Sequence, residues 1–504
     1  MIAKSFKTSL HAVLGRRALL SRHSLVLCAG ILALNLVAAE APLVPTFPGA
    51  EGHGSMTRGG RGGRVIAVTH LNDSGSGSLR AAVEAEGPRI VVFRTAGTIT
   101  LESRLTISNP YITIAGQTAP GDGIALRKYP IQIDADEVVI RYIRVRLGGE
   151  SGDDSDAISS RYHKNIILDH VSASWSIDET VSLYHGENVT VQWSLISESL
   201  YQSNHVKGHH GFGGIWGSNY STYHHNLLAH HSSRNPRFGS GCGYTDHRNN
   251  VIFNWGINSA YGGEKHQQGN PKFSHCVINM VGNYYKPGPA TIPGEVSRRI
   301  ANPSSRDEAA DFGRWFIAGN FMHGNPAVTR ENWNGGVQPQ HEDKHVSVLK
   351  LDEPWPAMPI HEQPAEEAYL AVLRDAGATL PKRDAIDRRI IEETRRGEAT
   401  YEGAGYKQRH PEIDASKPSG IIDSPEDVGG WPELASEPPP PDSDDDGMPD
   451  AWEEKFGLNP QAAADQALDG DRDGYTDVEE YLNGTDPTVF VDYTKPENNV
   501  NTLR

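Results

Sequence analysis

The sequence predicts an all-β protein whose main part coils into a parallel β-solenoid, followed by C-terminal helices and a small α-helical calcium-binding module. Short apolar runs recur between residues 65 and 322 at a loose period, with insertions of variable length. A solenoid tolerates such insertions because each coil contacts only its neighbours. The 52 Gly and 32 Pro also indicate a turn-rich, β-type chain. A propeller or a sandwich, the alternatives, would favour more even spacing.

Residues 1–39 have the pattern of a secretory signal peptide. A basic beginning precedes an apolar run over 25–38, and small residues close the run before Glu40. An N-terminal membrane anchor is the alternative, although the run is short for a span. We therefore expect a secreted, periplasmic or cell-surface protein with no stable membrane insertion after cleavage.

The solenoid is predicted to occupy residues 40–345. It should begin with β-branched runs at 65–69, 90–93 and 98–101 and a short helix at 78–84, and continue through runs at 111–115, 138–146, 165–172, 188–196, 222–229, 246–254, 277–285 and 314–322. In four later runs an asparagine stands just ahead of apolar residues: Asn226, Asn250, Asn283 and Asn320. These side chains either stack as an interior hydrogen-bonded ladder or serve singly in turns.

The chain after the solenoid changes character. Residues 346–410 are predicted to be a helical extension packed on the solenoid, with two helices within 366–397 separated at Gly377 and Pro381. Residues 411–441, rich in Pro, Ser and acidic residues, are typical of a semi-rigid linker. Residues 488–504 form a terminal tail.

Residues 442–487 contain two calcium loops in the EF-hand register. A hard cation needs several oxygen ligands on a tight turn, which Gly447 and Gly474 permit at the sixth position of each loop. The predicted ligands are Asp442, Asp444, Asp446, Asp450 and Glu453 in the first loop, and Asp469, Asp471, Asp473, Asp477 and Glu480 in the second. The module is either a stabilising unit or a dockerin-like attachment domain, in which case a scaffold protein would be its partner.

Charge and cysteine content limit the remaining possibilities. The formal net charge of −17 argues against a nucleic-acid partner. Only Cys242 and Cys276 follow the signal segment, and they form either one disulfide or two buried thiols.

Charged residues of both signs gather between residues 153 and 237. Asp156 is followed about one coil later by Asp178 and Glu179, and then by Lys207, His210, Arg234 and Arg237. Residues separated by whole coils return to one face of a solenoid, so these charges can share a groove. A surface ion-pair network is the plain interpretation. The alternative is a cation site beside a base, and its oxygen-rich ligand set favours Ca²⁺ over zinc.

Several motifs in this order resemble the pectate lyase family of polysaccharide lyases: GSLRAA (77–82), IVVFRTAGTI (90–99), DAIS (156–159), NIILDHVSASWSIDE (165–179), VTVQWSLI (189–196) and RNPR (234–237). The resemblance covers about residues 47–290. It implies a right-handed parallel β-helix and a secreted enzyme that cleaves polygalacturonate, or a related uronic-acid polymer, by calcium-dependent β-elimination. It also implies an acidic polysaccharide as the partner.

The resemblance assigns roles to single residues. Asp156 and Asp178 match calcium ligands, whereas the next ligand falls at Ser182, where Glu179 could substitute. Arg234 matches the catalytic base, and Arg237 matches the second arginine of the Arg-x-Pro-Arg motif.

Further matches concern the substrate. Lys207 lies near the substrate-binding lysine, and Lys207, His210 and Arg237 are the candidates for substrate contacts. A second substrate-binding arginine falls at Gly239. Because a neutral arginine is scarce, Lys207 remains an alternative base.

Two other functions stay open at this point. A glycoside hydrolase on the same scaffold would use Asp153 and Asp154 or Asp156 as its acid/base pair. A carbohydrate-binding or adhesive solenoid would have no catalytic residues.

Overall fold

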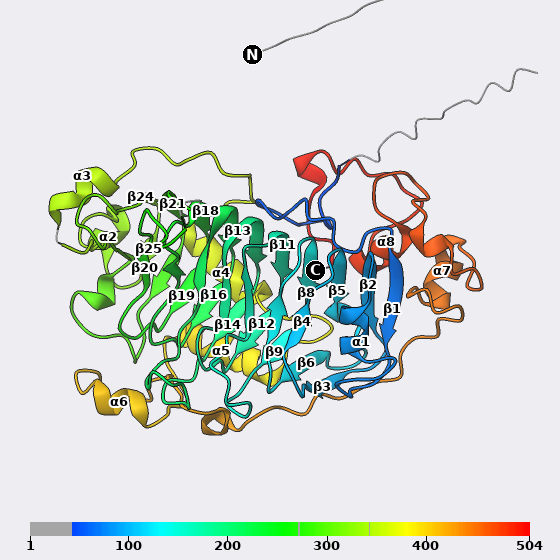
Figure 1. Cartoon of the computed structure of the whole chain (residues 1–504), viewed down its shortest axis with the longest axis horizontal. Coiled ribbons are helices and arrows are strands. Elements are labelled where there is room, and N and C mark those ends of the chain that lie inside the picture. The colour runs from blue at the N-terminus through cyan, green and yellow to red at the C-terminus, as the bar shows by residue number, and fades with distance from the viewer. Residues whose placement is uncertain (1–42, 271–272, 342, 504) are drawn as a thin grey trace, which may run out of the picture. The chain divides into compact units, whose positions relative to one another are not determined.

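The computed structural model describes residues 43–503 except 271, 272 and 342 (Figure 1). The predicted signal segment lies outside these residues. The described residues form one compact unit. No helix in the described part is long and apolar enough to cross a membrane.

The solenoid is the parallel β-helix that the sequence predicted, and every strand pairing within it is parallel. Most coils contribute strands to three faces. The first face is formed by β1 (Arg64–Val68), β2 (Arg89–Phe93), β5 (Ile112–Ala115), β8 (Val138–Arg141), β11 (Lys164–Asp169), β13 (Val181–Gln192), β15 (Ile215–His224), β18 (Gly243–Arg248), β21 (Cys276–Val281) and β24 (Arg314–Ala318).

The second face is a separate nine-stranded sheet. Its strands are β3 (Gly97–Thr100), β6 (Ile124–Arg127), β9 (Arg144–Arg146), β12 (Ser172–Ser174), β14 (Leu195–Ser197), β16 (Leu227–Ala229), β19 (Val251–Phe253), β22 (Tyr284–Lys286) and β25 (Phe321–Met322).

The third face was not predicted. Its strands are β4 (Leu105–Ile107), β7 (Ile131–Ile133), β10 (Ile158–Arg161), the first halves of β13 and β15, β17 (Arg237–Phe238), β20 (Ala260–Gly262) and β23 (Ala301–Pro303). Apart from the long β13 and β15, these strands have two to four residues and several carry polar side chains, so they lack a strong apolar signal.

The predicted asparagine ladder is present inside the solenoid. Asn226 donates its side-chain amide to Asn250 over 3.0 Å, Asn250 to Asn283 over 3.1 Å and Asn283 to Asn320 over 2.8 Å. The structure adds Asn332 as a fifth member, 3.0 Å from Asn320. Each amide satisfies buried backbone groups as well, so the ladder holds the turns of neighbouring coils in register.

The two helices predicted within 366–397 are α4 (Ala365–Asp375) and α5 (Ala385–Arg396). Their buried apolar side chains, such as Val372 and Ile390, pack against the second face. Asp384 caps the start of α5 and forms an ion pair of 2.9 Å with the buried Arg146. Other helical segments are α1 (Leu79–Glu84), α2 (Pro326–Arg330), α3 (Val346–Leu349), α6 (Gly405–Arg409), α7 (Asp450–Phe456), α8 (Asp477–Asn483) and the short 3₁₀ turns Gly116–Thr118, Val296–Arg298, Asp343–His345, Pro425–Val428, Asp465–Ala467 and Pro496–Asn498.

Segment 411–441 differs from the predicted linker because it is bound to the solenoid. Figure 1 shows it running between α6 and α7 beneath the coils. Ile421 and Ile422 are buried, and the Trp431 indole donates to the carbonyl of Arg146 over 2.8 Å. The Pro-rich composition suggested an extended spacer, but burial of the apolar and aromatic residues binds this segment to the solenoid.

The C-terminal segment 442–487, the predicted calcium-binding module, is also docked rather than free. Met448, Val478 and Leu482 pack on Ile90 and Val92, which project outward from β2. The module therefore supplies the cover for the first face at its N-terminal end.

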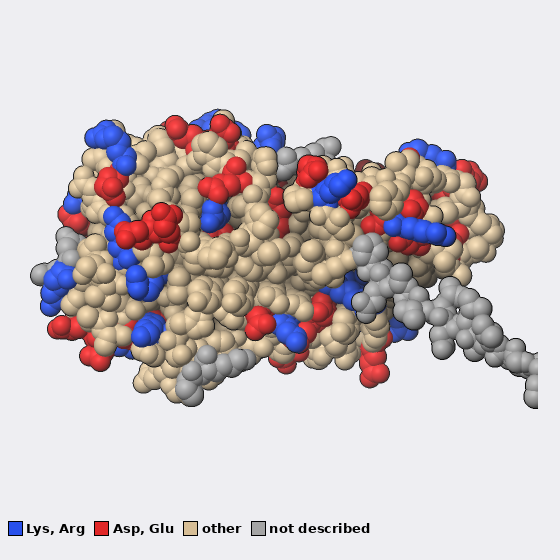
Figure 2. Space-filling model, turned by 90° about the horizontal axis from the view of Figure 1, so that it is seen from above, with Lys and Arg blue, Asp and Glu red and all other residues tan. Residues whose placement is uncertain are grey.

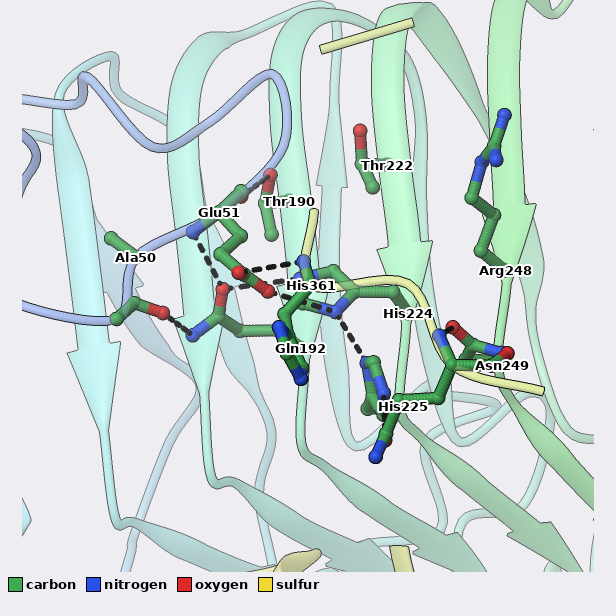
Figure 3. A network of polar contacts seen from close by, with 12 residues as sticks. Ala50, Glu51, Thr190, Gln192, Thr222, His224, His225, Arg248, Asn249 and His361 are labelled. Carbon is green, nitrogen blue, oxygen red and sulfur yellow. Dashed lines mark hydrogen bonds and ion pairs between the residues drawn. The ribbon is translucent and has the colours of Figure 1, made fainter. Parts of the chain in front are cut away.

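A polar network fixes the N-terminal segment to the same face farther along the solenoid. Gln192 accepts from the backbone of Glu51 over 3.0 Å, and the carboxylate of Glu51 accepts from the backbone of His361 over 2.8 Å. Figure 3 shows Gln192 and His224 side by side beneath these two segments. The buried polar groups of this network form hydrogen bonds with one another, so we assign the network a structural role.

The open question about the cysteines is resolved by the structure. Cys242 and Cys276 are buried and form a disulfide that joins neighbouring coils.

Candidate active site

Four successive coils place the candidate residues next to one another through backbone hydrogen bonds. Asp178 donates its N–H to Ser155 over 3.3 Å, Phe212 donates to Asp178 over 3.2 Å, and Gly214 donates to Arg234 over 2.9 Å. A Cβ on Gly213 would lie 2.4 Å from the carbonyl oxygen of Arg234. The glycines of the GFGG motif, residues 211–214, therefore permit the close stacking that brings the site together.

Arg234 lies among carboxylates and aromatic rings. Its guanidinium contacts Glu179, is 3.9 Å from Asp178 and lies 4.4 Å above the ring of Phe212. Its Nε also donates to the hydroxyl of Tyr261 over 3.3 Å. The side chain keeps about a fifth of its surface exposed, which leaves it accessible to solvent.

Asp178 is the centre of the polar contacts. His210 Nε2 lies 2.5 Å from its Oδ1, and the ring of His205 stacks on His210 at 3.9 Å. Burial acts to raise the pKa of Asp178, but the hydrogen bond and charge of His210, together with Arg234, lower it overall. His210 is 5% exposed, so the structure places it as a partner of Asp178 rather than on an open binding surface.

Asp156 completes the carboxylate group. Its Oδ1 accepts from the backbone N–H of Glu179 over 3.1 Å. Burial, followed by the charge of Asp178, raises the pKa of Asp156 to about 7, against a hydrogen bond from Ser182 that lowers it. Oxygens of Asp156, Asp178 and Glu179 all lie within 4.8 Å of one another, so Glu179 stands where a third carboxylate was expected.

Lys207 and Arg237 flank this group. Lys207 is exposed on the loop before the GFGG motif, and none of the described carboxylates lies within ion-pair distance of it. Arg237 is bound by Glu264 through contacts of 2.9 and 3.1 Å. The attraction of Glu264 raises the pKa of Arg237 although burial opposes the shift.

Sequence reasoning missed several members of the site. His205, Phe212 and Tyr261 contact the predicted residues, and Glu264 holds Arg237. His205 and Phe212 lie in segment 205–214, beside the predicted Lys207 and His210, whereas Tyr261 and Glu264 come from the unpredicted third face and had no local signal.

The two tail loops are folded around their carboxylates. Glu453 is fully buried and neither of its side-chain oxygens has a hydrogen-bond partner. Its oxygen, one of Asp446 and one of Asp465 lie within 4.8 Å of one another, so Asp465 is an additional candidate ligand that the register did not predict. Burial and neighbouring carboxylates raise the pKa of Glu453 to about 8 and that of Asp446 to about 7.

The other predicted ligands fall into two groups. Asp442 joins Asp444 and Asp446, and in the second loop Asp469, Asp471 and Asp473 gather likewise. One oxygen of Glu480 is buried without a partner. Asp450 and Asp477, at the ninth position, accept from backbone N–H groups of Ser443 and Gly470 over 2.7 and 3.4 Å instead of joining these clusters.

Charges elsewhere on the surface are mixed. Figure 2 shows Lys and Arg beside Asp and Glu in small groups on the face it presents, with no continuous basic area there. That face offers no electrostatic footprint for nucleic acid.

Comparison with known proteins identifies relatives along most of the chain, although no family model matches it. Proteins named "Probable pectate lyase C" from Aspergillus flavus and Aspergillus fumigatus are 33% and 32% identical over 467 and 448 residues. These alignments cover 91% and 88% of this chain and 98% and 94% of the relatives.

Solved structures resemble the chain more distantly. The cedar pollen allergen jun a 1 gives a TM-score of 0.47 at 16% identity, over 65% of this chain and 92% of that one. A pectate lyase from Bacillus sp. N165 in complex with trigalacturonate gives 0.44 at 16% identity, over 65% and 98%. The fungal sequences alone carry the assignment: this chain belongs to the pectate lyase family, a class of polysaccharide lyases.

Proposed function

We propose that the protein is a calcium-dependent lyase that cleaves polygalacturonate, or a related uronic-acid polymer, by β-elimination. The observation that carries the proposal is the accessible Arg234 beside the carboxylates of Asp178 and Glu179, in a chain related to proteins named pectate lyases. We extend the proposal to a secreted, periplasmic or cell-surface location, on the pattern of residues 1–39.

The carboxylate group fits a hard cation. Asp178 Oδ1 contacts His210 and Glu179 Oε1 contacts Arg234, but burying these two carboxylates within 4.8 Å of Asp156 is costly without further positive charge. Together with Asp156 they form an all-oxygen set, the kind that Ca²⁺ prefers. These three residues would hold the ion.

Calcium, when bound, would supply positive charge that binds the uronate carboxylate and offsets the charge developing as C5 loses its proton. Arg234 would accept that proton in its neutral form, since a charged guanidinium has no acceptor. The ring of Phe212 and the hydroxyl of Tyr261 orient its guanidinium, so its position does not depend on the substrate. The electron pair of the C5–H bond forms the C4–C5 double bond, the C4–O4 bond breaks with its electron pair going to O4, and O4 takes up a proton.

Lys207 and Arg237 have supporting roles in this scheme. Lys207, exposed and free of described carboxylates, is suited to contact the substrate, and it remains the second candidate for the base. Arg237 is held by Glu264 but keeps about a quarter of its side chain exposed, so it can contribute positive charge to the groove.

For the tail we propose calcium binding with a stabilising role. The fully buried, unpartnered oxygens of Glu453 support a cation, and the packing of Met448, Val478 and Leu482 on the solenoid supports the role. A dockerin-like role would need an apolar face turned toward a partner protein. These side chains are instead buried against the protein's own β2.

The lyase proposal is tested with polygalacturonate and Ca²⁺, following the absorbance of the unsaturated product. Arg234→Ala should lower kcat by about 10²–10⁴, the range for loss of a general base, whereas the exposed Arg330→Ala on α2 should not. Saturated products formed without calcium would identify a hydrolase. Polymer binding without turnover in the unchanged protein would identify a binding solenoid.

Two further measurements separate the finer claims. Asp178→Asn should raise the calcium concentration needed for activity, whereas Glu453→Gln should leave that requirement unchanged. N-terminal sequencing of the protein exported by an expression host should start near Glu40; an intact N-terminus on a membrane-bound product would favour the anchor.

A further inference from the structure

The third face forms a floor beside the carboxylate group, and one row of its outward positions is unusual. Arg161 on β10 pairs with Tyr184 on β13, and Tyr184 pairs with Gly217 on β15. Gly239, just after β17, continues the row, because its N–H donates to the carbonyl of Trp216 over 2.8 Å. The row therefore begins with a cation and an aromatic ring and continues with two positions that lack side chains.

Of the two glycines only Gly239 leaves room for a side chain, because a Cβ on Gly217 would lie 2.5 Å from the Cβ of Cys242. A Cβ on Gly239 would have no atom closer than 3.6 Å, so steric crowding does not explain why this position lacks a side chain. Gly239 is also the position where the resemblance led us to expect a substrate-binding arginine. Arg161 stands in the same row three strands away, roughly 14 Å at the usual spacing of ~4.8 Å between strands.

Arg161 is exposed and has no carboxylate partner. None of the carboxylates in the described part of the chain lies within ion-pair distance of it, and Asp134 and Asp136 on the preceding coil contact His163 at 2.9 and 3.2 Å. Its guanidinium lies 5.0 Å from the ring centre of Tyr184 and 4.7 Å from that of Tyr162. Stacking on rings fixes the plane of a guanidinium and leaves its N–H edges free for a carboxylate.

The row is close to the carboxylate group. Ser159 and Ser182 pair two residues before Arg161 and Tyr184 on the same two strands. The side chain of Ser182 forms a hydrogen bond with Asp156. Burial raises the pKa of Tyr184; the charge of Arg161 acts to lower it, whereas the charges of Asp156 and Asp178 raise it further. A sugar chain that passes the carboxylate group along the floor would therefore meet Arg161 within a short distance.

We propose that Arg161, supported by the ring of Tyr184, binds the carboxylate of a uronate sugar of the substrate. This sugar would lie next to the reacting one, toward the N-terminal coils of the solenoid, and its binding would give the enzyme a preference for a charged polymer. This proposal rests on the proposed lyase function. It gives Arg161 a substrate-binding task in a chain that has Gly239 in place of the expected arginine. A carboxylate fits because a guanidinium fork binds its two oxygens at once.

The test compares Arg161→Gln and Arg161→Lys with the unchanged protein on polygalacturonate. Arg161→Gln should raise KM about tenfold or more, as expected for a lost charge-assisted hydrogen bond, and change kcat less than about twofold. Arg161→Lys should recover part of the affinity. Arg64→Gln is the matched control, because Arg64 is an exposed arginine on β1 of another face.

Chain length gives a second readout. The penalty of Arg161→Gln should be present with long oligogalacturonates and vanish with the shortest ones that are cleaved, since these would not reach Arg161. An unchanged KM on the polymer, or an equal rise in Arg64→Gln, would overturn the proposal.

Failure of the lyase function would be recognised separately. If the unchanged protein shows no turnover, calorimetric titration with hexagalacturonate still decides: weaker binding by Arg161→Gln supports the subsite, and equal binding overturns it. If Arg234→Ala keeps its activity, the base assignment fails without affecting the role of Arg161.

Discussion

The buried carboxylate of Glu453 leads to a prediction in which one substitution has opposite effects in two buffers. With calcium present, Glu453→Gln should destabilise the protein, because it removes a ligand from the first tail loop. Binding at a concentration one hundred times Kd stabilises a folded protein by about 2.7 kcal/mol, and this is the size of the expected loss. In metal-free buffer the substitution should stabilise, since Gln removes a charge that has no partner on either oxygen.

The pH dependence follows from the same group. The folded pKa of about 8 is above the ordinary value of 4.5, so the folded state binds the proton more tightly than the unfolded state. The associated stability is complete below about pH 4.5 and is lost as pH rises through 8. Metal-free protein should therefore be less stable at pH 8 than at pH 5, and Glu453→Gln should weaken that dependence.

Thermal unfolding followed by the fluorescence of Trp452, which lies in the apolar contact between module and solenoid, measures the effect. Glu454→Gln on the exposed side of α7 is the matched control and should behave like the unchanged protein in both buffers. Equal destabilisation of Glu453→Gln with and without calcium would refute the idea that this carboxylate holds a cation.

Three further predictions concern the solenoid. Asn283→Ala should lower the free energy of unfolding by about 3 kcal/mol in chemical denaturation, because it leaves buried partners on both sides of the ladder unsatisfied; a loss below 0.5 kcal/mol would contradict the ladder's role. Burial acts to raise the pKa of Glu393, but His230 lowers it to about 2. The ionised carboxylate should therefore contribute stability above pH 4.5 that disappears as pH falls through 2. In thermal melts Glu393→Gln should destabilise the protein at pH 7 and have no effect near pH 2. Glu264→Gln frees Arg237, and kcat/KM on polygalacturonate should fall about tenfold with the calcium requirement unchanged; unaltered kinetics would show that the pair does not serve the site.

Parts of the site were predictable because their signals are local. Asp156, Asp178 and Arg234 each lie in a motif of the family, and the structure brings all three together. Ser182 shows the limit of such motifs. Its hydroxyl forms a hydrogen bond with Asp156. The third carboxylate comes instead from the buried Glu179, which directly follows Asp178.

Tyr261 and Glu264 were not predictable from local patterns. They orient Arg234 and Arg237 from a coil 27 residues further along, through hydrogen bonds between side chains. Contacts of this kind depend on how many residues each coil contains, and insertions change that number from coil to coil.

The sequence by itself predicted the parallel β-helix, the helices α4 and α5 and the register of the two acidic tail loops, and it offered the asparagine ladder as one of two alternatives. Each of these depends on a spacing that repeats along the chain or on residues within one turn. Only the tertiary structure decided that residues 411–441 lie bound to the solenoid, that the tail covers β2, and which residues of the third face surround Arg234. These features join segments hundreds of residues apart or very short strands, where burial of apolar surface and pairing of buried charge act across coils and leave no periodic pattern in the sequence.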